Sequence, residues 1–254
     1  TLKNRFGGFF FCHRRLLRPA AGRHPPCISP SCKRIMPKEE KEEEIMKVFV
    51  AGGTGRVAHY VIRDLLAQGD MVAAGCRHPE KLEHQEGLVP VQMDLHADVR
   101  DLAALIRGCD AVYFLAGSRG KDLLQTDAFG AVKLMLAAQQ AGVSRFVMLS
   151  SMFALQPEKW KQEPGIDTII DYDIAKFFAD HWLSHNTKLD WTIIQAGLLQ
   201  ETPGTGKIEL DPAHEGGISI EDIAAVLADV LTMKNTYGKI IMAKNGDTPI
   251  KEAL

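Results

Sequence analysis

Three side chains in the second half of the chain have the types and spacing needed for proton transfer at an oxygen. Tyr172 and Lys176 are four residues apart and therefore share one face of a helix. Tyrosine has an unperturbed pKa of about 10, and a nearby ammonium favours the phenolate. We therefore expect Lys176 to lower the pKa of Tyr172. Tyr172 would then exchange a proton with a carbonyl or hydroxyl oxygen of the substrate, and Ser151 would hydrogen-bond to the same oxygen. The alternative is a tyrosine packed on the core and a lysine in solvent.

A glycine-rich segment has the spacing of a phosphate-binding turn. Gly52, Gly55 and Ala58 follow a short apolar run and precede a helical pattern. Gly52 permits a tight turn, Gly55 lets the backbone approach a pyrophosphate, and Ala58 leaves room for the helix to pack on the strand. The helix N-terminus then presents free N–H groups to the phosphates. The alternative is a purely structural turn. The cofactor-binding residues expected in this loop are Gly52, Thr54, Gly55, Arg56 and Val57.

The residues that follow the second strand distinguish NAD from NADP in such a fold. An acidic residue there would bind the ribose 2′-hydroxyl and favour NAD. This chain has Arg77 instead, and Arg56 lies in the glycine loop. Arginine pairs well with a phosphate, so we expect NADP, with NAD as the less favoured cofactor. The alternative is that both arginines are merely solvated.

The elements that must position these residues alternate between strands and helices. Apolar, β-branched runs predict strands at 46–51, 71–76, 88–93, 111–116, 145–149, 191–195 and 239–243. Amphipathic patterns predict helices at 57–68, 78–84, 99–107, 122–141, 170–185 and 220–233, with Ser219 as an N-cap and Gly142 as a C-cap. This alternation predicts an α/β fold with a doubly wound, mostly parallel sheet of the Rossmann type, which binds ligands at the carboxyl ends of its strands.

Charge divides the 254 residues into two regions. Residues 1–37 carry eight Lys and Arg and no Asp or Glu, whereas residues from Met46 onward carry 20 Lys and Arg against 27 Asp and Glu. An acidic body is not expected to bind nucleic acid, and no apolar run approaches the roughly 20 residues that span a bilayer. We expect 1–45 to be a disordered basic extension and 46–254 a single domain. An organelle transit peptide and an upstream extension are the alternatives for the first segment.

Cysteine usage indicates a reducing compartment, and we expect a cytoplasmic protein. Cys76 and Cys109 are the only cysteines after residue 45, too few for a disulfide framework. Candidate zinc ligands lie in the 1–45 extension: Cys12, His13, His24, Cys27 and Cys32. Their spacing fits no standard zinc finger well, so no metal is expected.

Residues 46–244 resemble the short-chain dehydrogenase/reductase superfamily, and more narrowly its atypical, sugar-epimerase-like branch. The resemblance rests on segments 51–58, 94–95, 116–117, 149–151, 172–176 and 195–199. It implies that Ser151 rather than Ser150 is catalytic and that Lys176 binds the nicotinamide ribose. Further cofactor contacts that it implies are Asp94 and Leu95 at the adenine, Ala116 and Gly117 at the ribose, and Ala196, Gly197 and Leu198 beside the nicotinamide.

Two departures from the family pattern bear on the substrate. The family usually has Arg-Pro-Gly after the sixth strand, where this chain has Gln195-Ala196-Gly197, and the inserts at 152–169 and 198–219 are short. Short inserts indicate a small-molecule substrate. We expect an NAD(P)H-dependent oxidoreductase that acts on a small carbonyl or hydroxyl compound. The alternatives are a non-enzymatic NADP(H)-binding redox sensor that binds partner proteins, and a sugar epimerase with tightly held NAD. The oligomeric state stays open.

Overall fold

The computed structural model describes residues 45–254, in which nine strands form one sheet in the order β11-β8-β10-β6-β5-β4-β1-β2-β3. The strands from β3 to β10 in this order pair parallel with one another, whereas β8 near the other edge pairs antiparallel with both β10 and β11. The strand bounds are β1 Lys47–Ala51, β2 Met71–Cys76, β3 Leu88–Gln92, β4 Ala111–Phe114, β5 Arg145–Ser151, β6 Asp190–Ala196, β8 Lys207–Leu210, β10 Lys239–Asn245 and β11 Thr248–Pro249. The predicted mostly parallel sheet is therefore confirmed.

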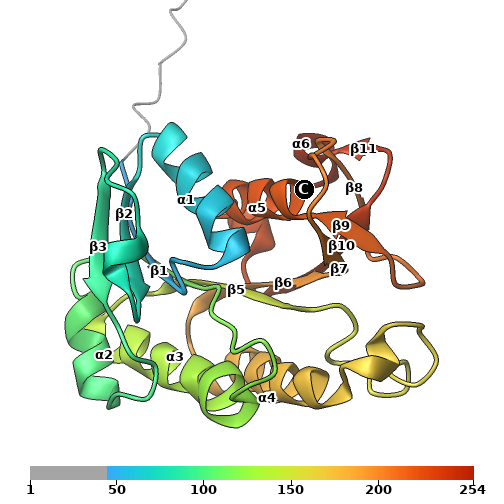
Figure 1. Cartoon of the computed structure of the whole chain (residues 1–254), viewed down its shortest axis with the longest axis horizontal. Coiled ribbons are helices and arrows are strands. Elements are labelled where there is room, and N and C mark those ends of the chain that lie inside the picture. The colour runs from blue at the N-terminus through green and yellow to red at the C-terminus, as the bar shows by residue number, and fades with distance from the viewer. Residues whose placement is uncertain (1–44) are drawn as a thin grey trace, which may run out of the picture. The chain divides into compact units, whose positions relative to one another are not determined.

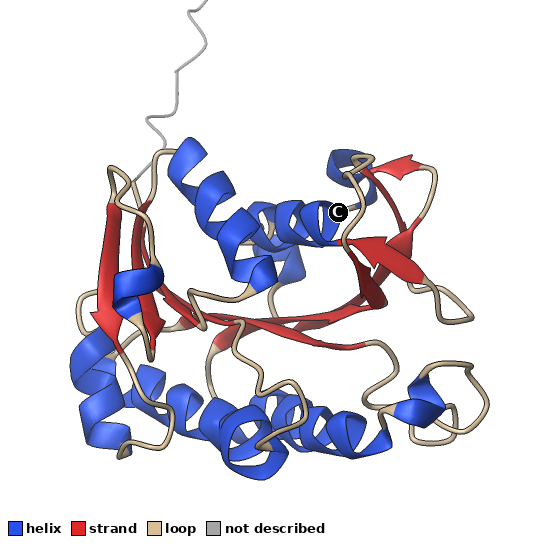
Figure 2. Ribbon diagram, in the orientation of Figure 1, coloured by secondary structure: helices blue, strands red, loops and turns tan. Residues whose placement is uncertain are grey.

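Helices cover both faces of the sheet, as Figures 1 and 2 show. Helices α1 (Arg56–Ala67) and α5 (Ile220–Asp229) pack together on one face, and α2 (Val99–Ile106), α3 (Phe129–Ala141) and α4 (Ile170–Asn186) lie on the other. A short helix, α6 (Ile250–Ala253), lies near the C-terminus. This doubly wound arrangement brings the loops after β1, β2, β4, β5 and β6 to one edge of the sheet.

The central strand β1 shows how the sequence fills both layers of the core. Val48 and Val50 belong to the apolar cluster beneath α1 and α5, whereas Phe49 and Ala51 belong to the cluster beneath α2, α3 and α4. All four side chains are fully buried. Successive side chains of a strand point to opposite faces, so a strand covered on both faces needs a continuous apolar run.

Several predicted helices have different bounds. The 78–84 segment forms only a 3₁₀ turn, Pro79–Lys81, which buries no side chain and so gains little from packing. The 122–141 segment divides into a π-helical part, η2 (Leu123–Ala128), and α3, which ends at Gly142 with the predicted left-handed cap. Helix α5 ends at Asp229 rather than at 233, and the predicted N-cap is confirmed because Ser219 Oγ accepts a hydrogen bond from the Glu221 amide.

The two inserts contain short elements that the sequence patterns did not predict. Strands β7 (Leu198–Gln200) and β9 (Gly217–Ser219) form a separate two-stranded parallel sheet, and the 3₁₀ helix η3 (Ile166–Thr168) is a single turn, as is η4 (Lys234–Thr236) outside the inserts. Elements of three residues are too short to show a periodicity.

The predicted extension and its candidate zinc ligands lie outside the described residues. Within residues 45–254, no helix combines the length and apolar character needed to cross a membrane. Cys76 and Cys109 are both unpaired, and Cys76 is buried.

Candidate functional site

The glycine loop is held against the ends of two neighbouring strands. The Gly52 and Gly53 amides donate to the Gly75 carbonyl at 2.8 and 3.1 Å. Gly52 has a φ of 93°, and a Cβ atom there would lie 2.7 Å from the Ala116 Cα. Only glycine fits this turn, because any side chain would meet both the backbone strain and the end of β4.

The first turn of α1 is suited to bind an anion. Its N-cap is Gly55, which supplies no side-chain hydrogen bond, and the turn contains no acidic residue. Ala58 is fully buried, as expected for close packing of the helix on the sheet. The amides of the first turn and the positive end of the helix dipole therefore remain for a ligand, and the residues present fit a dinucleotide phosphate.

The two arginines predicted to read a 2′-phosphate have different surroundings. Arg77 is exposed after β2, and its side chain makes no ion pair with any residue of the described part. Arg56 Nη1 instead lies 2.8 Å from Glu201 Oε1, beside a pocket of about 450 Å³ between α1 and the loop after β7. Both partners of that pair are exposed, so the contact is weak and a phosphate can replace it.

The residues expected at the adenine and ribose also differ in accessibility. Asp94 is exposed, and its Oδ1 accepts a hydrogen bond from the His96 amide at 2.9 Å. Leu95 is mostly buried in the core beneath α2 and α3, so its contribution is to packing. Ala116 and Gly117 lie at the end of β4, where Gly117 is exposed.

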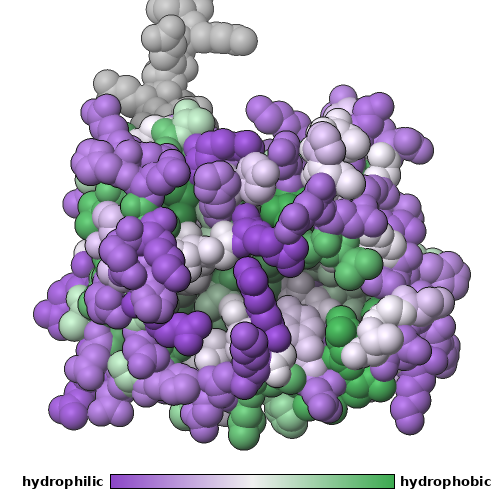
Figure 3. All heavy atoms as spheres, in the orientation of Figure 1, coloured by the Kyte–Doolittle hydropathy of each residue, from purple (hydrophilic) through white to green (hydrophobic). Residues whose placement is uncertain are grey.

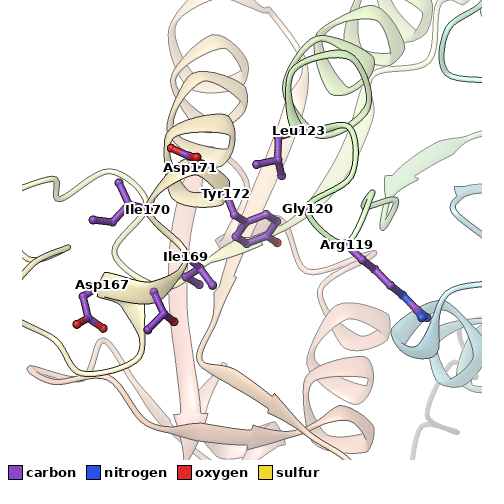
Figure 4. Close-up of a pocket in the computed structure, with 9 residues that line it drawn as sticks. Arg119, Gly120, Leu123, Asp167, Ile169, Ile170, Asp171 and Tyr172 are labelled. Carbon is purple, nitrogen blue, oxygen red and sulfur yellow. The ribbon is translucent and has the colours of Figure 1, made fainter.

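Helix α4 brings Tyr172 and Lys176 together as their spacing predicted. Lys176 is 2 % exposed, its Nζ donates to the Leu149 carbonyl at 3.0 Å, and the same atom lies 5.5 Å from the centre of the Tyr172 ring. Tyr172 lines a pocket of about 540 Å³ with residues of the β4–η2 loop, including Arg119 and Gly120. Figure 4 shows the Tyr172 ring pointing between Ile169 and Gly120, and Figure 3 shows a hollow with a hydrophilic rim on this face.

Lys176 lowers the pKa of Tyr172 as expected, but the net pKa of Tyr172 is not lowered. Burial of the phenol raises its pKa above the ordinary value, and Asp127, Asp173 and Asp180 raise it further. Lys176 opposes the rise without outweighing it. Tyr172 is therefore a neutral phenol near pH 7, which suits a proton donor better than a base.

The two serines at the end of β5 are distinguished by their partners. Ser150 Oγ donates to Asp180 Oδ2 at 2.8 Å, and Gln195 Nε2 donates to the same oxygen at 2.8 Å. Gln195, which stands where the family has arginine, thus points into the interior. Ser151 is 8 % exposed and lies beside Asp173, whose charged form it favours. Ser151 rather than Ser150 is left with a hydroxyl for a ligand.

The loop after β6 approaches the second insert closely. A Cβ atom at Gly197 would clash with the Gly216 carbonyl oxygen, and the Leu198 amide donates to that oxygen at 3.0 Å. Ala196 is buried and its carbonyl accepts from the Met152 amide, whereas the Leu198 side chain is 61 % exposed.

Three buried carboxylates near Tyr172 were missed by the sequence analysis. Asp127, Asp173 and Asp180 are fully buried. One oxygen each of Asp127 and Asp180 has no hydrogen-bond partner, and Ser151 is the neutral group beside Asp173. Burial raises the pKa of both Asp173 and Asp180 to about 6. The spacing of Asp173 and Asp180 from Lys176 places the three residues on the same face of α4, and this is the signal that could have grouped them.

The two short inserts contact one another at one side of the site. Lys159 Nζ donates to the Ala213 carbonyl at 2.6 Å. Glu163 accepts hydrogen bonds from the Glu215 amide at 3.0 Å and from His214 Nδ1 at 3.1 Å. Glu215 of this contact faces Asp173, the residue that follows Tyr172.

A family model described as NAD(P)H-binding matches residues 52–234, which include the glycine loop, the β5 serines and the Tyr172–Lys176 pair. The chain belongs to the NAD(P)H-binding family. The predicted atypical short-chain dehydrogenase/reductase type is confirmed with it.

Similar proteins of the NAD(P)H-binding family match over nearly their whole length. The uncharacterized sugar epimerase YhfK of Bacillus subtilis is 35% identical over 217 residues, covering 82% of this chain and 99% of its own. The UPF0659 protein YMR090W of Saccharomyces cerevisiae is 32% identical, covering 82% and 96%. The crystal structure of the oxidoreductase ylbE from Lactococcus lactis is 40% identical with a TM-score of 0.80, covering 82% and 94%.

Proposed function

We propose that this protein is an NAD(P)H-dependent oxidoreductase that reduces a small carbonyl compound, with Tyr172 as the proton donor. The observation that carries the proposal is the pair of half-buried Tyr172 and buried Lys176, whose tyrosine lines a pocket at the same sheet edge as the glycine loop. Bound NAD(P)H would supply the hydride. The pocket of about 540 Å³ suits a small substrate.

Each residue of the site has a distinct part in this reaction. The carbonyl oxygen would accept hydrogen bonds from the Tyr172 and Ser151 hydroxyls, which orient it and hold the negative charge that develops on it. Tyr172 would then transfer its phenolic proton to that oxygen. Lys176, fixed by the Leu149 carbonyl, stabilises the phenolate that remains. Tyr172 is a neutral phenol at neutral pH, so its proton is present for the reduction direction.

For the cofactor, we propose NADP(H) read by Arg77. Its exposed guanidinium follows β2, where a 2′-phosphate would lie in a Rossmann site, and no ion pair within the described residues occupies it. Arg56 is the secondary candidate, because it would first have to leave Glu201. A cytoplasmic location stays a proposal that rests on cysteine usage.

Substitution of Tyr172 by Phe tests the catalytic role. The variant keeps the ring that packs beside Lys176 and loses only the hydroxyl, so we expect turnover to fall by about 10²–10⁴-fold while cofactor affinity is preserved. The measurement is NADPH oxidation with a panel of small aldehydes and ketones, together with titration calorimetry of NADPH. Unchanged turnover would exclude Tyr172 as the acid.

A sugar epimerase is the second candidate, because the similar protein of Bacillus subtilis carries that name. Such an enzyme returns the hydride to the same substrate. It would copurify with NAD and would show no net oxidation or reduction of cofactor. Absorbance of the denatured protein and NADPH consumption with carbonyl compounds distinguish the two functions.

A further inference from the structure

We propose that the buried aspartates around Tyr172 make this site prefer the oxidised, positively charged nicotinamide over the reduced, neutral one. This inference rests on the proposed function and concerns the redox state of the cofactor that the site retains. It assigns the selectivity for the oxidised cofactor to Asp127, Asp173 and Asp180.

The balance of buried charge is the first step of the argument. Asp127, Asp173 and Asp180 are each 0% exposed, and Lys176, 2% exposed, is the buried cation beside Tyr172. The Lys176 ammonium makes its hydrogen bond to the Leu149 carbonyl and forms no ion pair with a described carboxylate. The buried groups around Tyr172 therefore include three carboxylates and one ammonium, in a region where water does not screen their charges.

The orphaned oxygens are the second step. Oδ1 of Asp127 and Oδ1 of Asp180 lack a hydrogen-bond partner, and the group beside the buried Asp173 carboxylate is the Ser151 hydroxyl. Burial of an unpartnered carboxylate is costly, and native proteins retain such groups chiefly where a ligand or a reaction uses them. Asp127 Oδ1 lies 3.3 Å from where a Cβ of Gly117 would be, at the end of β4 that the family uses for the cofactor ribose.

The groups that face these carboxylates come from every neighbouring element. Asp173 is faced by Ser151 of β5 and by Glu215 of the β8–β9 loop, and Asp127 Oδ2 accepts a hydrogen bond from the Ser118 amide. Asp180 is faced by Ser150 of β5, Gln195 of β6 and Lys176 of its own helix. Apart from Lys176, all of these groups are neutral or acidic, and Arg119, the cation on the wall of the Tyr172 pocket, is exposed to solvent, so negative charges outnumber positive ones among these buried groups.

The reaction itself places the nicotinamide in that field. In carbonyl reduction the hydride reaches the carbon of the same C=O group whose oxygen receives the Tyr172 proton. A bound nicotinamide ring would therefore be separated from the Tyr172 hydroxyl only by the carbonyl group of the substrate. Burial is the main cause of the raised pKa of Tyr172, but each of the three aspartates raises it further, so all three act at this point. Three buried carboxylates beside one buried ammonium stabilise a positive ring more than a neutral one.

Titration calorimetry of the full chain with NADP⁺ and with NADPH tests the inference. At about pH 8 both aspartates with a pKa near 6 are ionised, and we expect NADP⁺ to bind at least about tenfold more tightly than NADPH. At about pH 5.5 protonation of Asp173 and Asp180 weakens the field, so the ratio should fall toward one. Equal affinities, or tighter NADPH binding, at about pH 8 would overturn the inference.

Single substitutions assign the effect to the carboxylates. D173N and D180N each keep the side-chain shape and should reduce the NADP⁺ preference about threefold or more, whereas D101N removes an exposed carboxylate on α2 and should leave it unchanged. Adenosine 2′-phosphate 5′-diphosphoribose lacks the nicotinamide, so its affinity should not change in any variant. A preference that survives both D173N and D180N would contradict the assignment.

The same experiment separates failure of this inference from failure of the proposed function. Binding of both dinucleotides with no redox preference would leave the oxidoreductase proposal standing and remove only the inference. Absence of binding by NADP⁺, NADPH and the ring-free analogue would overturn both. A confirmed preference would also make occupancy of the site follow the NADP⁺ to NADPH ratio, the property required of a redox sensor.

Discussion

Ser150 and Ser151 are neighbours in the sequence, but their side chains have different surroundings. Ser150 bonds to a buried carboxylate of α4, whereas Ser151 lies beside Asp173, the residue that follows Tyr172. The first contact stabilises the fold beneath the site. The second leaves a hydroxyl that can meet a substrate oxygen. Ser150 thus has a structural role, and the adjacent Ser151 has the proposed catalytic role.

Alanine at each serine should therefore give opposite results. S150A removes a hydrogen bond to buried Asp180, and we expect a loss of about 1–3 kcal/mol in the free energy of unfolding with turnover nearly intact. S151A should reduce turnover by about a hundredfold with little change in stability. Urea unfolding and NADPH oxidation measure the two effects. Equal losses of activity in both variants would contradict the division.

Residue types and spacing predicted part of the candidate site. The Tyr172–Lys176 interval and the glycine loop each carry a recognisable spacing, and the structure places both as expected. The buried aspartates could not be predicted in the same way, because a charged residue on a helix is usually solvated. Their burial depends on how α4 packs on β5 and β6, which no local pattern records.

Helix α4 is the element that concentrates titratable groups in the interior. Asp173, Lys176 and Asp180 occupy its buried stripe, while Phe178 and Trp182 remain partly exposed on the other side. This reverses the usual amphipathic pattern in which charges face water. The cost of burying the carboxylates appears in their pKa values, which are raised to about 6.

The raised values predict how stability depends on pH. A carboxyl with a higher pKa in the folded state binds its proton more tightly there, so its contribution is fully present below the unfolded pKa of about 4 and is lost as pH rises through about 6. We expect D180N to remove about 2–3 kcal/mol of this pH dependence between about pH 4 and pH 7. Urea unfolding of wild type and D180N at both pH values measures the difference. Parallel pH profiles would show that Asp180 titrates normally.

The elements themselves were predicted unevenly. Strands β1 to β6 lie within about two residues of the apolar runs, because a central parallel strand needs such a run to be buried on both faces. The 122–141 pattern could not reveal the π-helical turn η2, since the same side chains suit an α-helix. That turn contains Asp127, so a feature of the site depends on an irregularity that the sequence hides.

The whole molecule joins the two halves of the proposed reaction at one sheet edge. The glycine loop after β1 and the serines after β5 belong to strands separated only by β4, and α4 supplies Tyr172 and Lys176 beside them. Separate sequence patterns therefore converge only through the strand order of the doubly wound fold. The inserts leave a pocket of about 540 Å³ beside Tyr172, which limits the size of the substrate.

Deuterium transfer tests the central claim most directly. The full chain is incubated with small aldehydes and ketones and with NADPH that carries deuterium at the transferable position, and the products are analysed by mass spectrometry. The account predicts an alcohol with one deuterium on the former carbonyl carbon for wild type, and almost none for Tyr172→Phe. Bound NADPH that transfers no deuterium to any carbonyl compound of the panel, or equal transfer by the variant, would contradict it.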